Sequence, residues 1–196
     1  MSQSNLNTLL KEIRKCQECA NFLPHIPHPV LAISTKSQIL IIGQAPGQKV
    51  HKRGVPWQDK SGDVLREWLG VSDEQFYNPD LFGILPMGFC FPGHNKKGSG
   101  DNPPRPECAP LWHDRVLHEL TELKLTLLIG QYATTAYLGE SKKRNLTETV
   151  RHFDDYLPKY FPLVHPSPLN FRWQAKNKWF ISDVLPILKQ KIHSII

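Results

Sequence analysis

Four cysteines are the residues of this chain whose spacing most directly indicates chemistry. Cys16 and Cys19 form a C-x-x-C pair, and Cys90 and Cys108 follow with 17 residues between them. In a reducing compartment such cysteines are not expected to form structural disulfides. A C-x-x-C pair with two distant cysteines is typical of a metal or iron–sulfur site. Four thiolates suit both zinc and an iron–sulfur cluster, and four reduced, buried cysteines are the third interpretation.

A second group of reactive side chains lies in the stretch HPSPLN (165–170). His165 follows an apolar run, and the next residue is a proline that fixes its backbone. Ser167, between two prolines, would place its hydroxyl and nearby N–H groups where a phosphate could bind. Leu169 is a candidate wedge into a stack of bases. The alternative is a proline-rich loop with a surface histidine.

A third motif, GQAPG (43–47), follows the apolar run that ends at Ile42. Its two glycines, Gly43 and Gly47, would let the backbone approach a ligand closely. Gln44, Ala45 and Pro46 lie between them. An ordinary turn at the end of a strand explains the same residues equally well.

The elements that would position these motifs alternate between short apolar runs and helical patterns. Strands are predicted at 38–42, 81–87, 125–129 and 162–164, and helices at 5–16, 62–69, 109–123, 131–138 and 173–196, the last bent at Pro186. This order predicts one α/β domain over residues 1–196, a three-layer α/β/α sandwich with a central, mostly parallel four-stranded sheet. The strand ends, with GQAPG, MGFC (87–90) and HPSPLN, should then converge in one cleft.

The composition favours a soluble protein with a polyanionic partner. The net charge of +6 and the pI of about 9.2 suit nucleic acid. The longest apolar run, 39–42, is too short to span a membrane, and the N-terminus has no apolar core like that of a secretory signal. We expect a cytoplasmic monomer without membrane association. Candidate phosphate contacts, or simply a solvated basic surface, are Lys96, Lys97, Arg105, Arg172, Lys176 and Lys178.

Taken together and in order, these motifs resemble those of the uracil-DNA glycosylase superfamily. Its members carry a turn of the type GQDPYH or GEAPG after the first strand and HPSPLS or a relative after the last. Here GQAPG and HPSPLN match, and GVPW (54–57) with SGDVLREWL (61–69) resembles a stretch found in the iron–sulfur branch. LLIGQYATTAYL (127–138) resembles another segment of that branch. The resemblance covers about residues 10 to 180.

The resemblance implies a DNA glycosylase that flips a damaged base, uracil or a related one, out of DNA and hydrolyses its N-glycosidic bond. It implies that Trp57 stacks on the flipped base and that His165 stabilises the departing base. Gln44 would help bind the base or the water, with His51, Asp59 or Asp63 positioning the water. The remaining expected DNA or base contacts are Gly43, Ala45, Pro46, Gly47, Met87, Ser167, Leu169, Asn170 and Arg172. Cys16, Cys19, Cys90 and Cys108 would hold a [4Fe–4S] cluster.

Several departures from the family pattern leave other hypotheses open. The carboxylate of GQDPYH is Ala45 here, the glutamate of GEAPG is Gln44, and the asparagine that reads uracil falls at Pro86. The backbone near Met87 would then read the base, or the substrate is not uracil. A catalytically silent module that binds damaged DNA is the main alternative. A hydrolase of free nucleosides fits less well, because it would need neither a basic surface nor a wedge.

Overall fold

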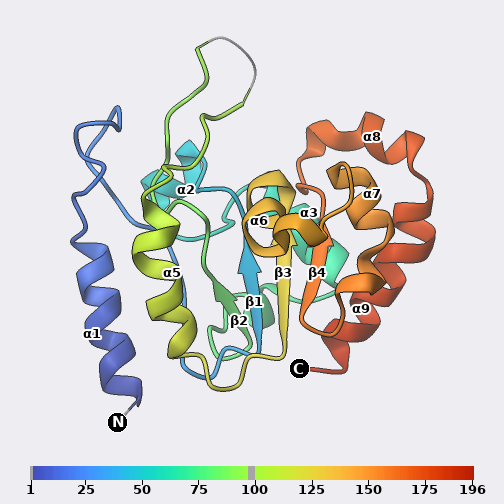
Figure 1. Ribbon diagram of the computed structural model, residues 1–196, viewed down its shortest axis with the longest axis horizontal. Helices are drawn as coiled ribbons and strands as arrows, with labels where there is room; N and C mark the ends of the chain where they lie inside the picture. Colours follow the sequence, from blue (N-terminus) through green and yellow to red (C-terminus); the bar gives the residue numbers. More distant parts are fainter. Residues whose placement is uncertain (1, 97–99) are drawn as a thin grey trace.

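Four strands form the centre of the molecule (Figure 1). The computed structural model describes residues 2–96 and 100–196, with their side chains except those of residues 2–4 and 169. The strands are β1 (Ile39–Ile42), β2 (Phe82–Ile84), β3 (Leu125–Ile129) and β4 (Tyr160–Leu163), in the spatial order β2-β1-β3-β4. Every pair of neighbouring strands is parallel, so the predicted sheet is confirmed.

Helices connect the strands and surround the sheet. They are α1 (Ser2–Arg14), α2 (Gln48–Arg53), α3 (Lys60–Leu69), α4 (Asp73–Phe76), α5 (Cys108–His118), α6 (Gly130–Leu138), α7 (Leu146–Arg151), α8 (Phe171–Lys176) and α9 (Leu185–His193). Short 3₁₀ turns cover Gly139–Ser141, Phe153–Tyr156 and Pro168–Asn170, and a π-helical segment, Phe180–Val184, leads into α9. Among the described residues, no helix has the length and apolar character needed to cross a membrane.

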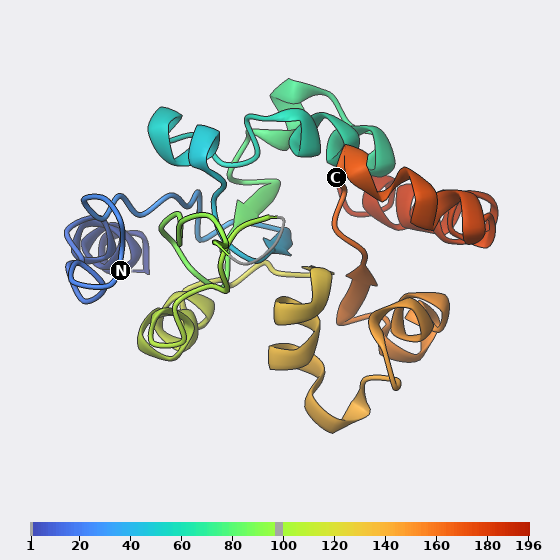
Figure 2. The ribbon, with the colours of Figure 1, turned by 90° about the horizontal axis from the view of Figure 1, so that it is seen from above.

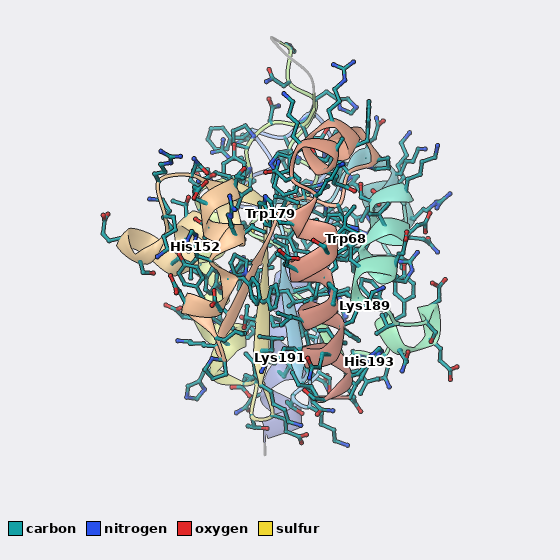
Figure 3. The ribbon with its side chains drawn as sticks, turned by 90° about the vertical axis from the view of Figure 1, so that its right-hand side faces the viewer. Trp68, His152, Trp179, Lys189, Lys191 and His193 are labelled. Carbon is teal, nitrogen blue, oxygen red and sulfur yellow. The ribbon has the colours of Figure 1, made fainter. Side chains whose placement is uncertain are left out.

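The two faces of the sheet have separate apolar cores because side chains alternate along each strand. Ile39 and Ile41 of β1 face a core shared with α3, α4, α7 and α9, whereas Leu40 and Ile42 face α1, α5 and α6. Viewed from above, the helices form a layer on each side of the strands (Figure 2). Figure 3 shows α9 alongside α3, where Trp68 contacts Phe180 at 4.9 Å between ring centroids. The three-layer arrangement is therefore confirmed.

The prediction of one continuous helix over 173–196 is wrong, because the chain breaks at Asn177. Asn177 ends α8, and its side-chain amide donates to the carbonyl of Trp173 at 2.8 Å. Asn177 has φ −120° and ψ 60°, outside the helical region. The π-helical segment follows, and Pro186 lies in the first turn of α9, where its missing N–H costs no hydrogen bond. Trp179, Val184 and Leu185 all have right-handed helical backbone angles, so the helix resumes in the π-helical segment and continues without interruption into α9.

The carboxyl ends of the strands lie at one edge of the sheet. The segment 43–47 follows β1, residues 85–88 follow β2, and Val164 and His165 follow β4. Strand β2 lies on one side of β1 and β3 on the other, so the chain order reverses around β1. Such a reversal at the carboxyl edge is where open α/β sheets bind ligands.

Candidate active site

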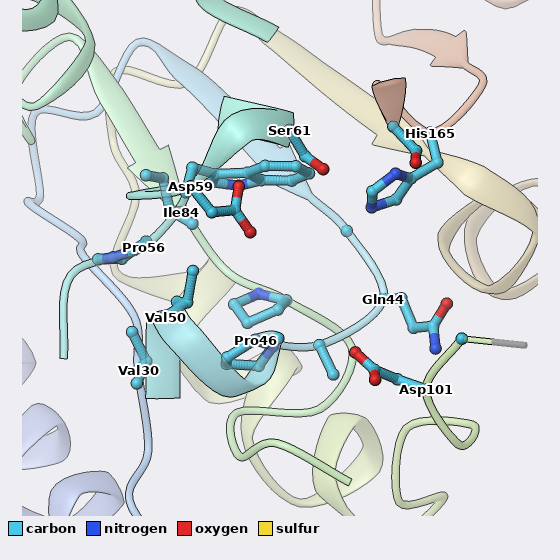
Figure 4. Close-up of a pocket in the computed structure, with 17 residues that line it drawn as sticks. Val30, Gln44, Pro46, Val50, Pro56, Asp59, Ser61, Ile84, Asp101 and His165 are labelled. Atoms are coloured by element: carbon cyan, nitrogen blue, oxygen red, sulfur yellow. The ribbon is translucent and has the colours of Figure 1, made fainter. Parts of the chain in front are cut away.

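A cavity of about 440 Å³ lies at this edge of the sheet. Figure 4 shows an apolar end with Val30, Val50, Pro56 and Ile84, and a polar side with Gln44, Asp101 and His165. The other lining residues are Gly43, Ala45, Pro46, Gly47, Trp57, Asp59, Ser61, Pro86, Gly100 and Ser167. The structure therefore brings GQAPG and the start of HPSPLN to one cavity, as the strand order predicts.

The backbone of GQAPG is tied to the segment that follows β2. The N–H of Met87 donates to the carbonyl of Gly43 at 2.8 Å, and the N–H of Gly88 donates to the carbonyl of Gln44 at 3.0 Å. The side-chain amide of Gln44 donates to the carbonyl of Asn102 at 3.0 Å. One end of the Gln44 side chain is thus committed to the loop around Asn102.

Trp57 is held in a backbone conformation that a bulky side chain rarely adopts, with φ 56°. Its carbonyl accepts hydrogen bonds from the Tyr77 hydroxyl at 3.3 Å and from Arg66 Nη1 at 3.4 Å. Its indole lies against the space beside Gly43, where a Cβ would be 3.1 Å from Trp57 Cζ2. Strained backbone of this kind clusters at functional sites. The strain here orients an aromatic ring toward the cavity.

His165 faces Trp57 across the cavity, with 5.8 Å between the ring centroids and 36° between the ring planes. Burial lowers the pKa of His165, while the carboxylates of Asp59 and Asp101 act in the opposite direction. The lowered pKa keeps the ring neutral near pH 7. The Asn170 side chain donates to the carbonyl of His165 at 2.7 Å, so Asn170 holds the loop rather than lining the cavity.

The three sequence candidates for positioning water are separated by the structure. Asp59 lines the cavity and caps α3, since its Oδ1 accepts from the N–H of Gly62 at 3.0 Å. Asp63 instead pairs with Arg66 at 2.5 Å and is 70 % exposed. His51 also lies outside the cavity lining.

His51 of α2 belongs to a cluster of aromatic rings that also contains His25, His28 and Phe91. Its ring centroid is 4.1 Å from that of His25 and 5.3 Å from that of His28. Its Nδ1 finds no hydrogen-bond partner among the described residues. Burial, with the neighbouring His25 and His28, lowers the pKa of His51 to about 4. His51 is therefore a neutral packing residue in this structure rather than a surface histidine.

The wall after β2 offers few hydrogen-bonding groups to a base. Pro86 has no N–H, and its carbonyl accepts from His113 Nε2 at 3.0 Å. The N–H of Met87 is engaged by Gly43, as described above, and its side chain packs into the core on the α1 and α5 side of the sheet. Met87 does not line the cavity, and neither does Arg172, which is exposed on α8.

The remaining basic candidates are spread over the surface. Arg105 pairs with Glu107 at 2.6 Å and lies over the Phe22 ring at 4.3 Å, which indicates a structural role. Lys176 and Lys178 are exposed at the end of α8, and Lys96 is exposed in the loop after Phe91. Lys97 and the side chain of Leu169 lie outside the described part of the chain.

The four cysteines line one small cavity beside α1 and α5. None of them forms a disulfide. Burial raises the pKa of the Cys90 thiol to about 11 and that of Cys108 to about 12. In the described residues no group of three or more His, Cys, Asp or Glu side chains is arranged to hold a metal ion. The structure therefore gathers the four candidate ligands around one cavity.

Comparison with known proteins identifies the family. The model of the uracil DNA glycosylase superfamily matches residues 32–189. The chain belongs to this superfamily. A type-4 uracil-DNA glycosylase of Sulfurisphaera tokodaii is 23 % identical over 180 residues, covering 83 % of this chain and 74 % of that protein.

Two further relatives carry the same name. The type-4 uracil-DNA glycosylase of Thermotoga maritima is 24 % identical over 165 residues, covering 81 % of this chain and 80 % of that protein. That of Archaeoglobus fulgidus is 21 % identical over 194 residues, covering 89 % and 88 %. These matches confirm the superfamily and the branch that the motifs indicate, and they mark the chain as uracil-DNA glycosylase-like.

Asp101 is a cavity residue that the sequence motifs do not point to. It lies in a polar loop after β2, between a glycine and an asparagine, and has no regular spacing from the other candidates. The structure places its Oδ2 3.8 Å from the position that a Cβ on Gly47 would take. A loop that folds back onto the sheet edge is not detectable from local pattern, so the sequence carried no signal for it.

Proposed function

We propose that this protein is a DNA glycosylase that flips a damaged or deaminated base, uracil or a related base, out of DNA and hydrolyses its N-glycosidic bond. The observation that carries the proposal is the approach of Trp57 and a neutral His165 to 5.8 Å within one cavity closed by residues 43–47. The relatives named uracil-DNA glycosylase support the same chemistry. Such enzymes serve base excision repair.

Binding of the base follows from the shape of the cavity. A flipped base enters a pocket by leaving the stack and regains stacking on an aromatic ring. Trp57 supplies that ring, and Val30, Val50 and Ile84 supply an apolar end. The volume of about 440 Å³ is within the range of ligand pockets and accommodates a base with its sugar.

The chemistry requires stabilisation of a departing base. Cleavage of a glycosidic bond passes through an oxocarbenium-like sugar, so the base leaves with the bonding electron pair. A neutral imidazole can donate a hydrogen bond to the base oxygen that gains charge, and His165 is placed for this role. Asp59 is the sequence candidate for positioning water whose side chain faces the same cavity.

The four cysteines are proposed to hold a [4Fe–4S] cluster. Cys16 and Cys19 follow α1, Cys90 follows β2, and Cys108 begins α5. When bound, the cluster supplies iron–thiolate bonds that cross-link these segments. The high thiol pKa values of Cys90 and Cys108 leave them as uncharged thiols unless a metal displaces their protons. The role of the cysteines is therefore structural, and they lie apart from the residues that line the base cavity.

DNA would approach from the side of HPSPLN. Ser167 lines the cavity, and Arg172 and Lys176 are exposed on the adjoining helix α8. Phosphate contacts from such residues make binding weaken as salt rises. The net charge of +6 favours the same interaction.

A cleavage assay tests the proposal. Labelled single- and double-stranded oligonucleotides carrying uracil, hypoxanthine, xanthine or a mismatch are incubated with the protein and then treated to break abasic sites. We expect abasic-site formation that His165→Ala abolishes and that His118→Ala, at an exposed position, leaves unchanged. Binding to DNA without cleavage of any substrate would contradict the enzyme and favour the silent binding module, for which Ala45 and Pro86 already argue.

A further inference from the structure

Residues 93–96 and 100–102 pair as the two arms of a hairpin, and the second arm reaches the cavity. His94 and Asp101 form an antiparallel bridge, and the N–H of Asn95 donates to the carbonyl of Gly100 at 3.0 Å. At the base of the hairpin, the N–H of Asn102 donates to the carbonyl of Gly93 at 2.8 Å. Gly100 and Asp101 line the cavity. The hairpin therefore contributes part of the cavity wall.

The base of this hairpin is fastened to the first motif. The Gln44 side chain donates to the carbonyl of Asn102 at 3.0 Å, and the Asn102 side chain donates to the carbonyl of Pro92 at 3.1 Å. Gln44 lies two residues after the end of β1, so this hydrogen bond links the hairpin to an inner strand of the sheet. Asp101 is the neighbour of this anchored residue, and its backbone position is accordingly fixed.

The carboxylates of Asp101 and Asp59 both lie near Gly47. The Oδ2 of Asp101 lies 3.8 Å, and the Oδ2 of Asp59 4.0 Å, from the position of a Cβ on Gly47. In each case Oδ1 is held elsewhere: Asp59 Oδ1 accepts from the N–H of Gly62, and Asp101 Oδ1 accepts from His94 Nδ1 at 2.9 Å. Figure 4 shows the two side chains on different sides of the cavity.

We propose that Asp101 is a catalytic residue that holds the attacking water together with Asp59, and that His94 is the residue that positions it. The proposal rests on the glycosylase function proposed above. The first motif offers no carboxylate, because Gln44 and Ala45 occupy the positions where one would be expected. The hairpin supplies a carboxylate to the same cavity from a different element.

The step in which the two carboxylates act is hydrolysis. The bond between C1′ and the base nitrogen breaks, and its electron pair leaves with the base. The water oxygen forms a bond to C1′, and one water proton passes to the carboxylate of Asp101 or Asp59 and from there to solvent. The base takes up a proton from solvent. The negative charge of the carboxylates also stabilises the positive charge that develops on the sugar.

His94 acts through Asp101 and not on the substrate. Its side chain is 63 % exposed, while that of Asp101 is 31 % exposed. The His94 ring packs edge-on against Phe91 at 5.0 Å between centroids, which fixes the Nδ1 that donates to Asp101. Loss of this donor would free the carboxylate to rotate, without removing its charge.

Single-turnover cleavage of the best base by the full-length protein tests the proposal. We expect Asp101→Asn to lower the cleavage rate by about 100-fold, the lower end of the range for positioned acid–base groups, because Asp59 still holds the water. Binding to the same DNA should be unchanged. Asp154→Asn, at an exposed position outside the cavity lining, is the matched control and should cleave at the wild-type rate.

The shared water predicts that the two substitutions are not additive. Asp59→Asn, which keeps a residue suited to capping a helix, should lower the rate as well. The double variant should lose more than the product of the two effects, because no carboxylate is then left to hold the water. His94→Ala should lower kcat with KM unchanged, and His94→Asn, which keeps an N–H donor in reach of Asp101, should restore much of kcat.

Three results would overturn the inference, and they are distinguishable. If the wild type cleaves and Asp101→Asn cleaves at the same rate, Asp101 is not catalytic although the glycosylase stands. If Asp101→Asn loses DNA binding in proportion to its rate, the residue contributes to binding only. If the wild type cleaves no base, the proposed function fails, and this inference fails with it.

Discussion

Gly62 is the position where a single methyl group should do most damage to the site. It lies in the first turn of α3, and a Cβ built there would be 1.7 Å from the carbonyl oxygen of Trp57 and 2.7 Å from its carbonyl carbon. The atoms in contact are backbone atoms, so no side-chain rotation relieves the overlap. Non-bonded heavy atoms of this kind are comfortable at about 3.5 Å or more. Gly62→Ala must therefore displace Trp57 by roughly 1.5 Å.

The expected loss of stability can be worked from these contacts. Overpacking of this kind costs about 1–3 kcal/mol. The displaced carbonyl also weakens its long hydrogen bonds from Tyr77 and Arg66, each contributing about 0.5 kcal/mol. Against this, alanine is favoured over glycine in a helix by up to about 1 kcal/mol. The net expectation is a loss of about 1–3 kcal/mol in the free energy of unfolding.

The effect on cleavage should be larger than the effect on folding. A misplacement of about 1 Å in a binding group can cost about 100-fold in rate, and here the displaced group is the predicted stacking ring. Gly43→Ala would press only on the outer edge of the same indole, where a Cβ would lie 3.1 Å from Cζ2. Its rate loss should be smaller, because the ring tip can shift by a few tenths of an ångström.

Urea denaturation and single-turnover cleavage of the variants measure the two effects separately. Gly47→Ala is the control for stability, since Gly47 has φ −73° and its Cβ would meet nothing closer than 3.8 Å. It should change the free energy of unfolding by less than about 0.5 kcal/mol. A Gly62→Ala protein that is more stable than the wild type and cleaves DNA at the wild-type rate would refute the reasoning. The overlap with the Trp57 carbonyl would then cost no measurable free energy, and only the higher helix propensity of alanine would remain.

Three further predictions concern parts of the molecule away from Trp57. Arg66→Met should lower the free energy of unfolding by about 2–3 kcal/mol in urea titrations, because the buried guanidinium bonds Tyr77 and the Trp57 carbonyl, and an unchanged midpoint would contradict this. Purified protein should be brown with about four irons per chain, and Cys108→Ser should lose both iron and colour; colourless wild-type protein with four free thiols would remove the cluster. Folding lowers the pKa of His51 from 6.5 to about 4, so as the pH falls His51 is protonated in the unfolded chain before it is protonated in the folded protein. The free energy of unfolding should therefore decrease as the pH falls from 6.5 to about 4. His51→Phe should lose less stability over that window, and equal losses in both proteins would refute the assignment.

The fold was accessible from sequence because its signals are local and repeated. Ile39–Ile42 and Leu125–Ile129 are largely apolar runs, and such runs are typical of strands that are buried on both faces. Their alternation with amphipathic helices leaves few topologies once right-handed crossovers are required. The last helix was the exception, since the break at Asn177 depends on a side-chain hydrogen bond back to Trp173 that periodicity does not register.

The site was accessible only where its residues follow strands directly. Gly43 and His165 were found because each comes immediately after a strand region, and parallel strands end at one edge. His51, Asp59 and Asp63 are the residues that the sequence offers for positioning the water. In the structure the His51 ring packs against His25, and the Asp63 carboxylate pairs with Arg66. Both residues lie on helices, and their side chains are on faces that do not line the cavity.

The first motif and the hairpin depend on each other chemically. Gln44 fastens the hairpin by donating from its amide to the carbonyl of Asn102. A glutamate at this position has no N–H to donate when ionised, and its charge would face a carbonyl oxygen with the carboxylate of Asp101 lining the same cavity. The amide at 44 and the carboxylate at 101 therefore suit one another. The missing carboxylate of the first motif, which by itself argues for lost activity, is thus accompanied by an amide that fastens the hairpin carrying Asp101.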